Sequence, residues 1–174
     1  MRRLTFLVLG ILLPALPAAA GQVTIDFDGL AAGTVITTQY PLATFSSSSG
    51  NHNKALFAGS GNVLFTGPVG GALTGIEDTY IDFLYPVNGL TFTAVQPNGA
   101  GTVATFNVYE SGVLTASVPL TGLGGTGNKP VDLSAYVNVT RLEIVGIDPD
   151  PAENGVGWDD FSFTPDLQTT IGFD

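Results

Sequence analysis

The sequence predicts an all-β fold, a jelly-roll β-sandwich of two antiparallel sheets, and three observations support this prediction. Apolar and polar residues alternate over many short segments, which is the period of a strand with one buried face. Glycine (23 residues) and proline (11 residues) supply frequent turns, while a hydrophobic content of 44% argues against disorder. No segment carries a helical apolar stripe over about ten residues, so we expect about eight short strands joined by turns.

The expected strands follow in order along the chain. The first carries Val23, Ile25 and Phe27 on one face and polar residues on the other. Further strands are expected in segments 31–40, 54–67, 79–96, 101–120, 138–148 and 157–163. Within the third of these segments "PVNG" predicts a turn, and within the fourth "ESG" predicts the turn of a hairpin. The glycine-rich stretch "TGLGGTGNKP" predicts a flexible loop.

The N-terminus has the pattern of a secretory signal peptide. Arg2 and Arg3 precede the apolar run "LTFLVLGILLPALP", and "AAA" matches a small-residue cleavage site. The run is short and contains two prolines, so a retained membrane anchor is the less favoured alternative. We therefore expect a secreted, extracellular protein. Its expected parts are a signal peptide at 1–20, a β-sandwich domain at 21–165 and a C-terminal tail at 166–174.

Charge and cysteine content narrow the classes of partner. Without the two arginines of the signal peptide, three basic residues face fifteen acidic ones, a formal net charge of −12. Such a surface repels nucleic acid and anionic membranes, so neither is an expected partner. The chain has no cysteine, so an exported domain must be held by its core or by a metal. The expected partner is an extracellular glycan or matrix polymer, and self-association is a further option.

The adjacent aspartates of the last strand suggest a cation site. Strict alternation there places Asp159 on the face of Phe161 and Phe163, and Trp158 and Asp160 on the opposite face. The phenylalanine face is the expected core, so Asp159 would point inward, where a carboxylate needs hydrogen-bond donors or a metal.

A calcium site built from both ends of the domain follows from this placement. The first and last strands of a sandwich are commonly neighbours, which would bring Asp28 near Asp159 and Asp160, with the amide oxygens of Asn62 and Asn53 as further donors. Ca²⁺ binds six to eight such oxygens. The alternative is that Asp28 and Asp159 cap strand ends or accept hydrogen bonds from loop amides.

Two short motifs also carry a resemblance to known families. "IDFDGL" (25–30) and "GVGWDDFSF" (155–163) resemble the paired signatures of calcium-associated jelly rolls, and the strand pattern of residues 23–164 resembles exported bacterial proteins of the PEP-CTERM type. The motifs are similar to those of MAM-type adhesion domains and of carbohydrate-binding-module β-sandwiches. The resemblance implies a calcium-site role for Asp28 and Asp160. The chain differs from MAM domains in having no cysteine, and from the bacterial proteins in having no hydrophobic sorting tail.

A second candidate cation loop contains Asp148, Asp150 and Glu153. Its spacing does not follow the EF-hand order, and a run with two prolines is more often a solvated turn.

Aromatic residues are the candidates for contact with a ligand. Trp158 and Tyr109 are expected to provide flat surfaces for stacking on sugars, with core packing as the alternative for each. Tyr80, Tyr85 and Tyr136 belong to the same group.

The catalytic options are few. The single histidine, His52, has no nucleophile motif near it, so acyl-transfer chemistry is not expected. The sequence thus predicts a secreted, noncatalytic, calcium-stabilised module that binds carbohydrate or extracellular matrix. The alternatives are a self-associating matrix or fibre subunit and, with less support, a small glycoside hydrolase that uses two carboxylates.

Overall fold

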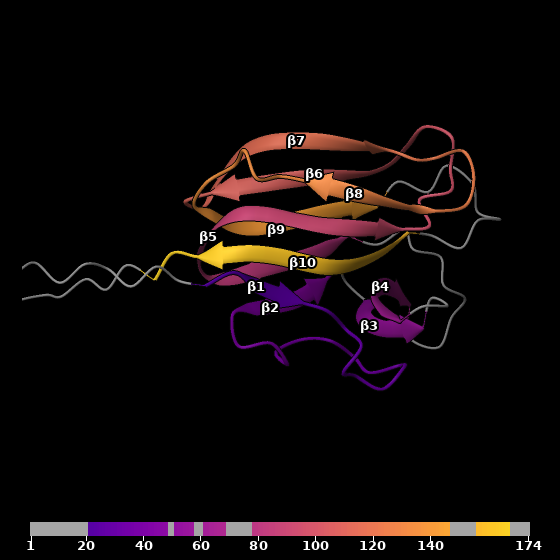
Figure 1. The fold of residues 1–174 in the computed structure, drawn as a ribbon, viewed down its shortest axis with the longest axis horizontal. Helices are drawn as coiled ribbons and strands as arrows, with labels where there is room; N and C mark the ends of the chain where they lie inside the picture. Colours follow the sequence, from indigo (N-terminus) through magenta and orange to yellow (C-terminus); the bar gives the residue numbers. More distant parts are fainter. Residues whose placement is uncertain (1–20, 49–50, 58–60, 69–77, 147–155, 168–174) are drawn as a thin grey trace, which may run out of the picture.

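The protein is a curled antiparallel sheet of ten strands (Figure 1). The computed structural model describes residues 21–48, 51–57, 61–68, 78–146 and 156–167. The strands are β1 (Val23–Ile25), β2 (Ala43–Ser47), β3 (Asn51–Phe57), β4 (Asn62–Pro68), β5 (Thr79–Val95), β6 (Thr102–Glu110), β7 (Val113–Thr121), β8 (Asn128–Asp132), β9 (Val139–Gly146) and β10 (Gly157–Pro165). The all-β prediction is confirmed. Within the described ranges, no helix has the length and apolar character needed to span a membrane.

The long strand β5 organises the sheet. The order is β3-β4-β10-β5-β9-β6-β7, with β1 paired to β10, and β2 and β8 paired to β5. The first half of β5 lies between β2 and β9, whereas its second half lies between β8 and β10. Because one strand changes its neighbours along its length, the sheet curls strongly around a single core (Figure 1).

The turn predicted at "PVNG" is wrong, because these residues lie inside β5. Pro86 has no N–H, and it falls where the ladder to β9 is interrupted between Asp82 and Val87. Gly89 adopts φ +67° beside a register shift in the ladder to β10. Residues typical of a turn therefore produce irregularities in a continuous strand.

The hairpin predicted at "ESG" is confirmed. Strands β6 and β7 pair in antiparallel fashion, and Ser111 and Gly112 connect them with φ values of +50° and +81°. Two consecutive positive φ values are typical of the hairpin turn whose twist matches that of its strands. The segment 121–130, predicted as a loop, connects β7 to β8 through residues 122–127, and its last three residues form the start of β8.

Aromatic rings fill the concave interior of the sheet. Phe92 of β5 stacks on Phe161 of β10 with ring centroids 4.8 Å apart, and it meets Phe106 of β6 edge-on at 5.1 Å. Trp158 contacts both Phe92 (6.1 Å) and Phe106 (5.6 Å). Rings from strands far apart in the sequence thus form one cluster, which fixes β10 against β5 and β6.

The face assignment predicted for the last strand is wrong at its start. The β10–β5 register shifts between Asp159 and Ser162, and Asp160 has φ +54°. This bulge adds one residue, so Trp158 lies on the same buried face as Phe161, and Asp159 lies off that face.

Candidate functional site

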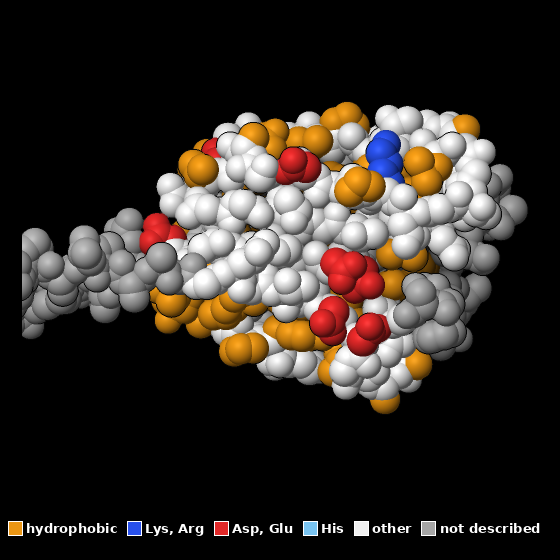
Figure 2. Space-filling model, in the orientation of Figure 1, with side chains coloured by type: hydrophobic (Ala, Val, Ile, Leu, Met, Phe, Trp, Pro, Cys, Tyr) orange, Lys and Arg blue, Asp and Glu red, His pale blue; other side chains and the backbone are white. Residues whose placement is uncertain are grey.

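Four aspartates lie around the junction of β1 and β10. The antiparallel pairing of Ile25 with Phe161 places the residues that follow β1 next to the bulge of β10, so the predicted adjacency of first and last strands is confirmed. We call this group the acidic cluster; it consists of Asp26, Asp28, Asp159 and Asp160. Figure 2 shows acidic side chains gathered in this part of the surface.

Asp159 is half-buried within the acidic cluster, next to three other carboxylates. Partial burial raises the pKa of the Asp159 carboxyl to about 6, with further contributions from the negative charges of the other cluster members. The N–H of Asp160 opposes this effect by donating to Asp159 Oδ1 at 2.9 Å. The neighbouring Tyr40 hydroxyl donates to the carbonyl oxygen of Asp26. Burial and the nearby aspartates raise the pKa of Tyr40 to about 12, so its proton stays in place.

Asp28 and Asn62 lie close together, as predicted. However, Asn62 acts there as a hydrogen-bond donor and not as an oxygen ligand. The backbone N–H of Asn62 donates to Asp28 Oδ1 at 2.7 Å, and its side-chain amide nitrogen donates to the carbonyl oxygen of Leu30 at 2.7 Å. Gly61 packs so closely on the Asp28 carboxylate that an added Cβ would overlap it. This arrangement matches the alternative in which Asp28 accepts hydrogen bonds from loop amides.

The other predicted metal ligands lie elsewhere or outside the described residues. Asn53 is buried, and its Oδ1 accepts hydrogen bonds from the hydroxyls of Thr66 (2.6 Å) and Thr79 (3.3 Å). Its amide nitrogen donates to the carbonyl oxygen of Ser46 at 2.8 Å. Asn53 pairs with Thr66 four positions along β4 from Asn62, about 13 Å away, so the structure does not bring it to the acidic cluster.

The described part of the chain does not present a ready-made metal centre. No three of its His, Cys, Asp or Glu side chains are arranged so that they could hold a metal ion. The second candidate loop, with Asp148, Asp150 and Glu153, lies outside the described residues.

A second polar surface covers the convex side of β5, β9, β6 and β7. Two rows cross these strands in register. The first contains Tyr80, Glu143, Asn107 and Ser117, and the second contains Asp82, Arg141, Tyr109 and Leu114. Their neighbours along the strands, such as Ile81, Leu142 and Val108, are buried in the core. We call these two rows the outer polar face.

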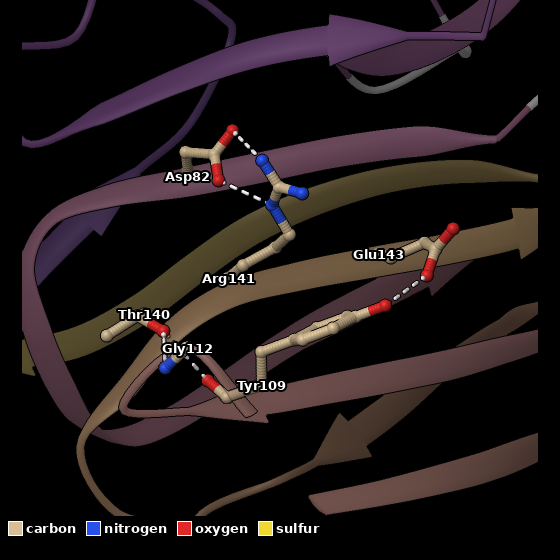
Figure 3. A network of polar contacts seen from close by, with 6 residues as sticks. All are labelled: Asp82, Tyr109, Gly112, Thr140, Arg141 and Glu143. Atoms are coloured by element: carbon tan, nitrogen blue, oxygen red, sulfur yellow. Dashed lines mark hydrogen bonds and ion pairs between the residues drawn. The ribbon is translucent and has the colours of Figure 1, made fainter. Parts of the chain in front are cut away.

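On one side of the outer polar face, an ion pair fixes the side chains of Asp82 and Arg141 (Figure 3). Arg141 binds Asp82 with two hydrogen bonds, Nε to Oδ1 at 2.5 Å and Nη2 to Oδ2 at 3.0 Å. The hydrogen bond to Asp82 raises the pKa of Arg141. The Arg141 guanidinium carbon also lies 5.9 Å from the centroid of the Tyr80 ring, within the range of a cation–π contact. Arg141 thus links an anion and an aromatic ring.

Hydrogen bonds order the other side. Glu143 Oε2 accepts from the Tyr109 hydroxyl at 3.1 Å and from the amide nitrogen of Asn107 at 2.9 Å. The Ser117 hydroxyl donates to Asn107 Oδ1 at 2.6 Å. The hydrogen bond to Glu143 raises the pKa of Tyr109, so this phenol is neutral at physiological pH. The face is therefore a connected set of polar groups held in fixed orientations on a sheet.

The two aromatic residues predicted to contact ligand have different environments. Tyr109 is half-buried on the outer polar face, with its ring along the surface of the sheet (Figure 3). Trp158 is only 4% exposed, so its indole has no face open to a sugar. The expected Trp158 platform is therefore corrected to a core residue, because the β10 bulge turns its side chain inward.

Reasoning from the sequence missed the charged members of the outer polar face. Asp82, Arg141 and Glu143 alternate with buried residues in β5 and β9, which indicated an exposed face but not which strands lie side by side. No protein-family model matches the chain, and no curated protein matches it at a significant level.

Proposed function

We propose that the protein is a secreted, noncatalytic module whose outer polar face binds an extracellular glycan. The observation that carries this proposal is the placement of Tyr80 and Tyr109 around a hydrogen-bonded carboxylate, Glu143, on a regular sheet. Aromatic rings pack against the apolar faces of sugars, and fixed polar groups bind hydroxyls. Because both tyrosines stand on paired strands, little ordering entropy is lost on binding.

Glycan retention by the purified protein tests this function. We expect binding to at least one polysaccharide of a panel, and Tyr80→Ala or Tyr109→Ala should each weaken it by roughly tenfold. Tyr85→Ala is the matched control, because Tyr85 is exposed but lies outside the two rows. Undiminished binding by the double variant would exclude this face, and failure to bind any glycan would exclude the function.

We also propose that the curled sheet is a jelly-roll β-sandwich. One layer would contain β2, the first half of β5, β9, β6 and β7, and the other β8, the second half of β5, β10, β1, β4 and β3. The divided pairing of β5 supports this arrangement. A crystal structure with β2 and β10 in the same layer would contradict it.

Calcium stabilisation is a further part of the proposal, with the acidic cluster as its place. Partial burial, and to a lesser extent the neighbouring carboxylates, raises the pKa of Asp159 to about 6, and a divalent cation bound here would favour its charged form. The carboxylates would have to reorient, since they do not form a ready-made centre in the described residues.

Thermal melts in excess calcium and in EDTA check this. Calcium at about a hundred times its dissociation constant adds about 2.7 kcal/mol of stability. The calcium response should shrink in Asp160→Asn, because the cluster loses one carboxylate, and persist in Asp132→Asn, where the carboxylate lies on β8. Equal melting temperatures in calcium and EDTA would exclude calcium stabilisation.

Self-association is the second candidate function, and one observation favours it. β7 ends the strand order, and Val113 and Leu114 there are 67% and 49% exposed. Exposed edge strands pair with further chains, although Pro119 within β7 offers no N–H for such pairing. Sedimentation over a concentration series without glycan measures this, and a monomer throughout would exclude it.

The remaining alternative is a small glycoside hydrolase. We expect retention on a glycan without turnover, and hydrolysis that one Asp→Asn or Glu→Gln change abolishes would overturn the noncatalytic proposal.

A further inference from the structure

We propose that the ligand of the outer polar face is an uncharged polysaccharide, and that the carboxylate of Glu143 is the acceptor that binds its hydroxyls. This inference rests on the glycan-binding function proposed above and names the class of glycan. Four features of the outer polar face support this inference: the pairing of Arg141 with Asp82, the net charge of the face, the second carboxylate oxygen of Glu143, and the length of the two rows.

The one guanidinium of the outer polar face, that of Arg141, is already paired with Asp82. Arg141 offers a planar pair of N–H donors, the group that recognises carboxylate and sulfate in a bidentate manner. In this structure that pair binds Asp82 through Nε and Nη2. The same guanidinium lies over the Tyr80 ring. An anionic sugar would have to displace Asp82 to use these donors.

The net charge of the outer polar face also favours an uncharged ligand. Two carboxylates, Asp82 and Glu143, stand against one guanidinium. The other basic side chains among the described residues that follow the signal region are Lys54 in β3 and Lys129 in β8, both outside the rows. A polyuronate or sulfated glycan would therefore meet a surface of its own sign, on a chain with an excess of acidic residues.

Glu143 has an acceptor available for a hydroxyl donor. Its contacts with Tyr109 and Asn107 both use Oε2. Figure 3 shows the second carboxylate oxygen directed away from Tyr109. Hydrogen bonds to a carboxylate are stronger than those to a neutral acceptor, and sugar hydroxyls can donate them. The Tyr109 ring, whose hydroxyl contacts the same carboxylate through Oε2, offers a surface for the apolar face of the same sugar.

The dimensions of the face favour a polymer. The rows cross four strands, from Tyr80 in β5 to Ser117 in β7. Three interstrand spacings make about 14 Å, which exceeds the width of one sugar ring. Contacts spread over such a row bind an extended chain better than a monosaccharide.

The experiment compares neutral, uronate and sulfated polysaccharides of matched length, at low and high salt, with the purified wild-type protein. We expect retention on a neutral polysaccharide, little dependence on salt, and no retention on the anionic ones. Salt-sensitive binding to an anionic glycan in place of a neutral one would overturn the inference and leave the glycan-binding function intact. Absence of binding to every glycan would overturn the function itself.

Variants test the role assigned to Glu143. Glu143→Gln keeps the side-chain shape and should weaken binding to the neutral glycan about tenfold. Glu110→Gln is the control, since it removes the same charge from the end of β6, where Glu110 accepts the N–H of Val137 at 2.6 Å. Equal binding by wild type and Glu143→Gln would overturn the role of Glu143. If Glu143→Gln does not fold, the wild-type comparison of glycans still decides the class of ligand. A dimer lost in Tyr109→Ala without glycan would instead show a second copy as the occupant.

Discussion

The acidic cluster and the outer polar face are both polar surfaces on paired strands, but the groups that surround their carboxylates differ. In the acidic cluster, the charged groups that shift the pKa of Asp159 are all carboxylates. On the outer polar face, Asp82 has Arg141, and Glu143 accepts two hydrogen bonds. In the first arrangement, burial and like charges disfavour the ionised form of Asp159, whereas in the second the charged groups are paired or hydrogen-bonded.

Backbone geometry parallels this difference. The rows of the outer polar face pair residue by residue from Thr79 to Asp82 along β9. The acidic cluster instead contains a bulge, with Asp160 at φ +54°. Bulges redirect side chains and concentrate at functional sites. The β5–β9 and β9–β6 ladders are regular across the two rows, the β6–β7 ladder shifts register between Val108 and Tyr109, and the bulge of β10 lies within the acidic cluster.

The largest effect is expected from breaking the anchor beneath the acidic cluster. Trp158→Ala removes the ring that packs on Phe92 and Phe106 and should lower the free energy of unfolding by about 3–5 kcal/mol. The variant has no tryptophan, because the chain contains only Trp158, so its unfolding in denaturant cannot be followed by tryptophan fluorescence. Circular dichroism should be used for both proteins. A loss below about 1 kcal/mol would contradict the buried placement of this indole.

The next effect tests the contact of Gly61 with Asp28. Gly61→Ala pushes a methyl group into the carboxylate and disturbs its hydrogen bond to the Asn62 N–H, so it should destabilise by about 1–2 kcal/mol. Gly29→Ala is the control, since its Cβ would meet nothing within 4 Å. In an Asp28→Ala background the Gly61→Ala effect should shrink, and additive effects would contradict the contact.

A smaller effect measures the cost of charging the partly buried Asp159 beside other carboxylates. Its folded pKa of about 6 exceeds the unfolded value of about 3.9, so the folded protein binds this proton more tightly and its stability falls as pH rises from about 4 to about 6. Asp159→Asn keeps an acceptor for the Asp160 N–H and should add about 1 kcal/mol at neutral pH, a value discounted for partial solvation. Melts across that pH range in EDTA check this, and an unchanged pH slope in the variant would count against it.

The smallest effect is expected on the outer polar face. Asp82 and Arg141 are 39% and 45% exposed, so Asp82→Asn should change stability by less than about 0.5 kcal/mol. Denaturant midpoints of both proteins measure the difference. A loss above about 2 kcal/mol would show that this pair supports the fold rather than the surface chemistry.

Much of the fold could be predicted from local patterns, but the tertiary register could not. Alternation indicated most of the strands, "ESG" indicated the hairpin, and the proximity of Asp28 to the last strand is confirmed. The strand expected at 31–40 is wrong, because this segment contains only an isolated bridge at Val35, and β2 and β8 were not expected. The path of β5 through Pro86 was missed, because a turn signal and a strand irregularity use the same residues. The face of Trp158 was missed because a bulge depends on the neighbouring strand.

The two candidate sites were predictable to different degrees. Asp159 and Asp160 were identified because adjacent charges interrupt an apolar strand, which is visible in one segment, and Asp28 was added because first and last strands of a sandwich are commonly neighbours. The outer polar face depends on β9 lying between β5 and β6, a pairing of segments far apart in the chain. Asn53 resembled a surface oxygen donor, and the β3–β4 pairing that buries it beside Thr66 is likewise non-local.

The position of β5 has a consequence for how the chain acquires its structure. β5 completes its ladders only with β2 from the first part of the chain and with β10 from the last. Such distant pairings must close long loops, so refolding should take milliseconds to seconds. During synthesis three of the four partner strands of β5, namely β8, β9 and β10, are made only after β5 itself. The protein should therefore reach a protease-resistant state only after its last strand has been made, and the amides of β5 should exchange with solvent most slowly.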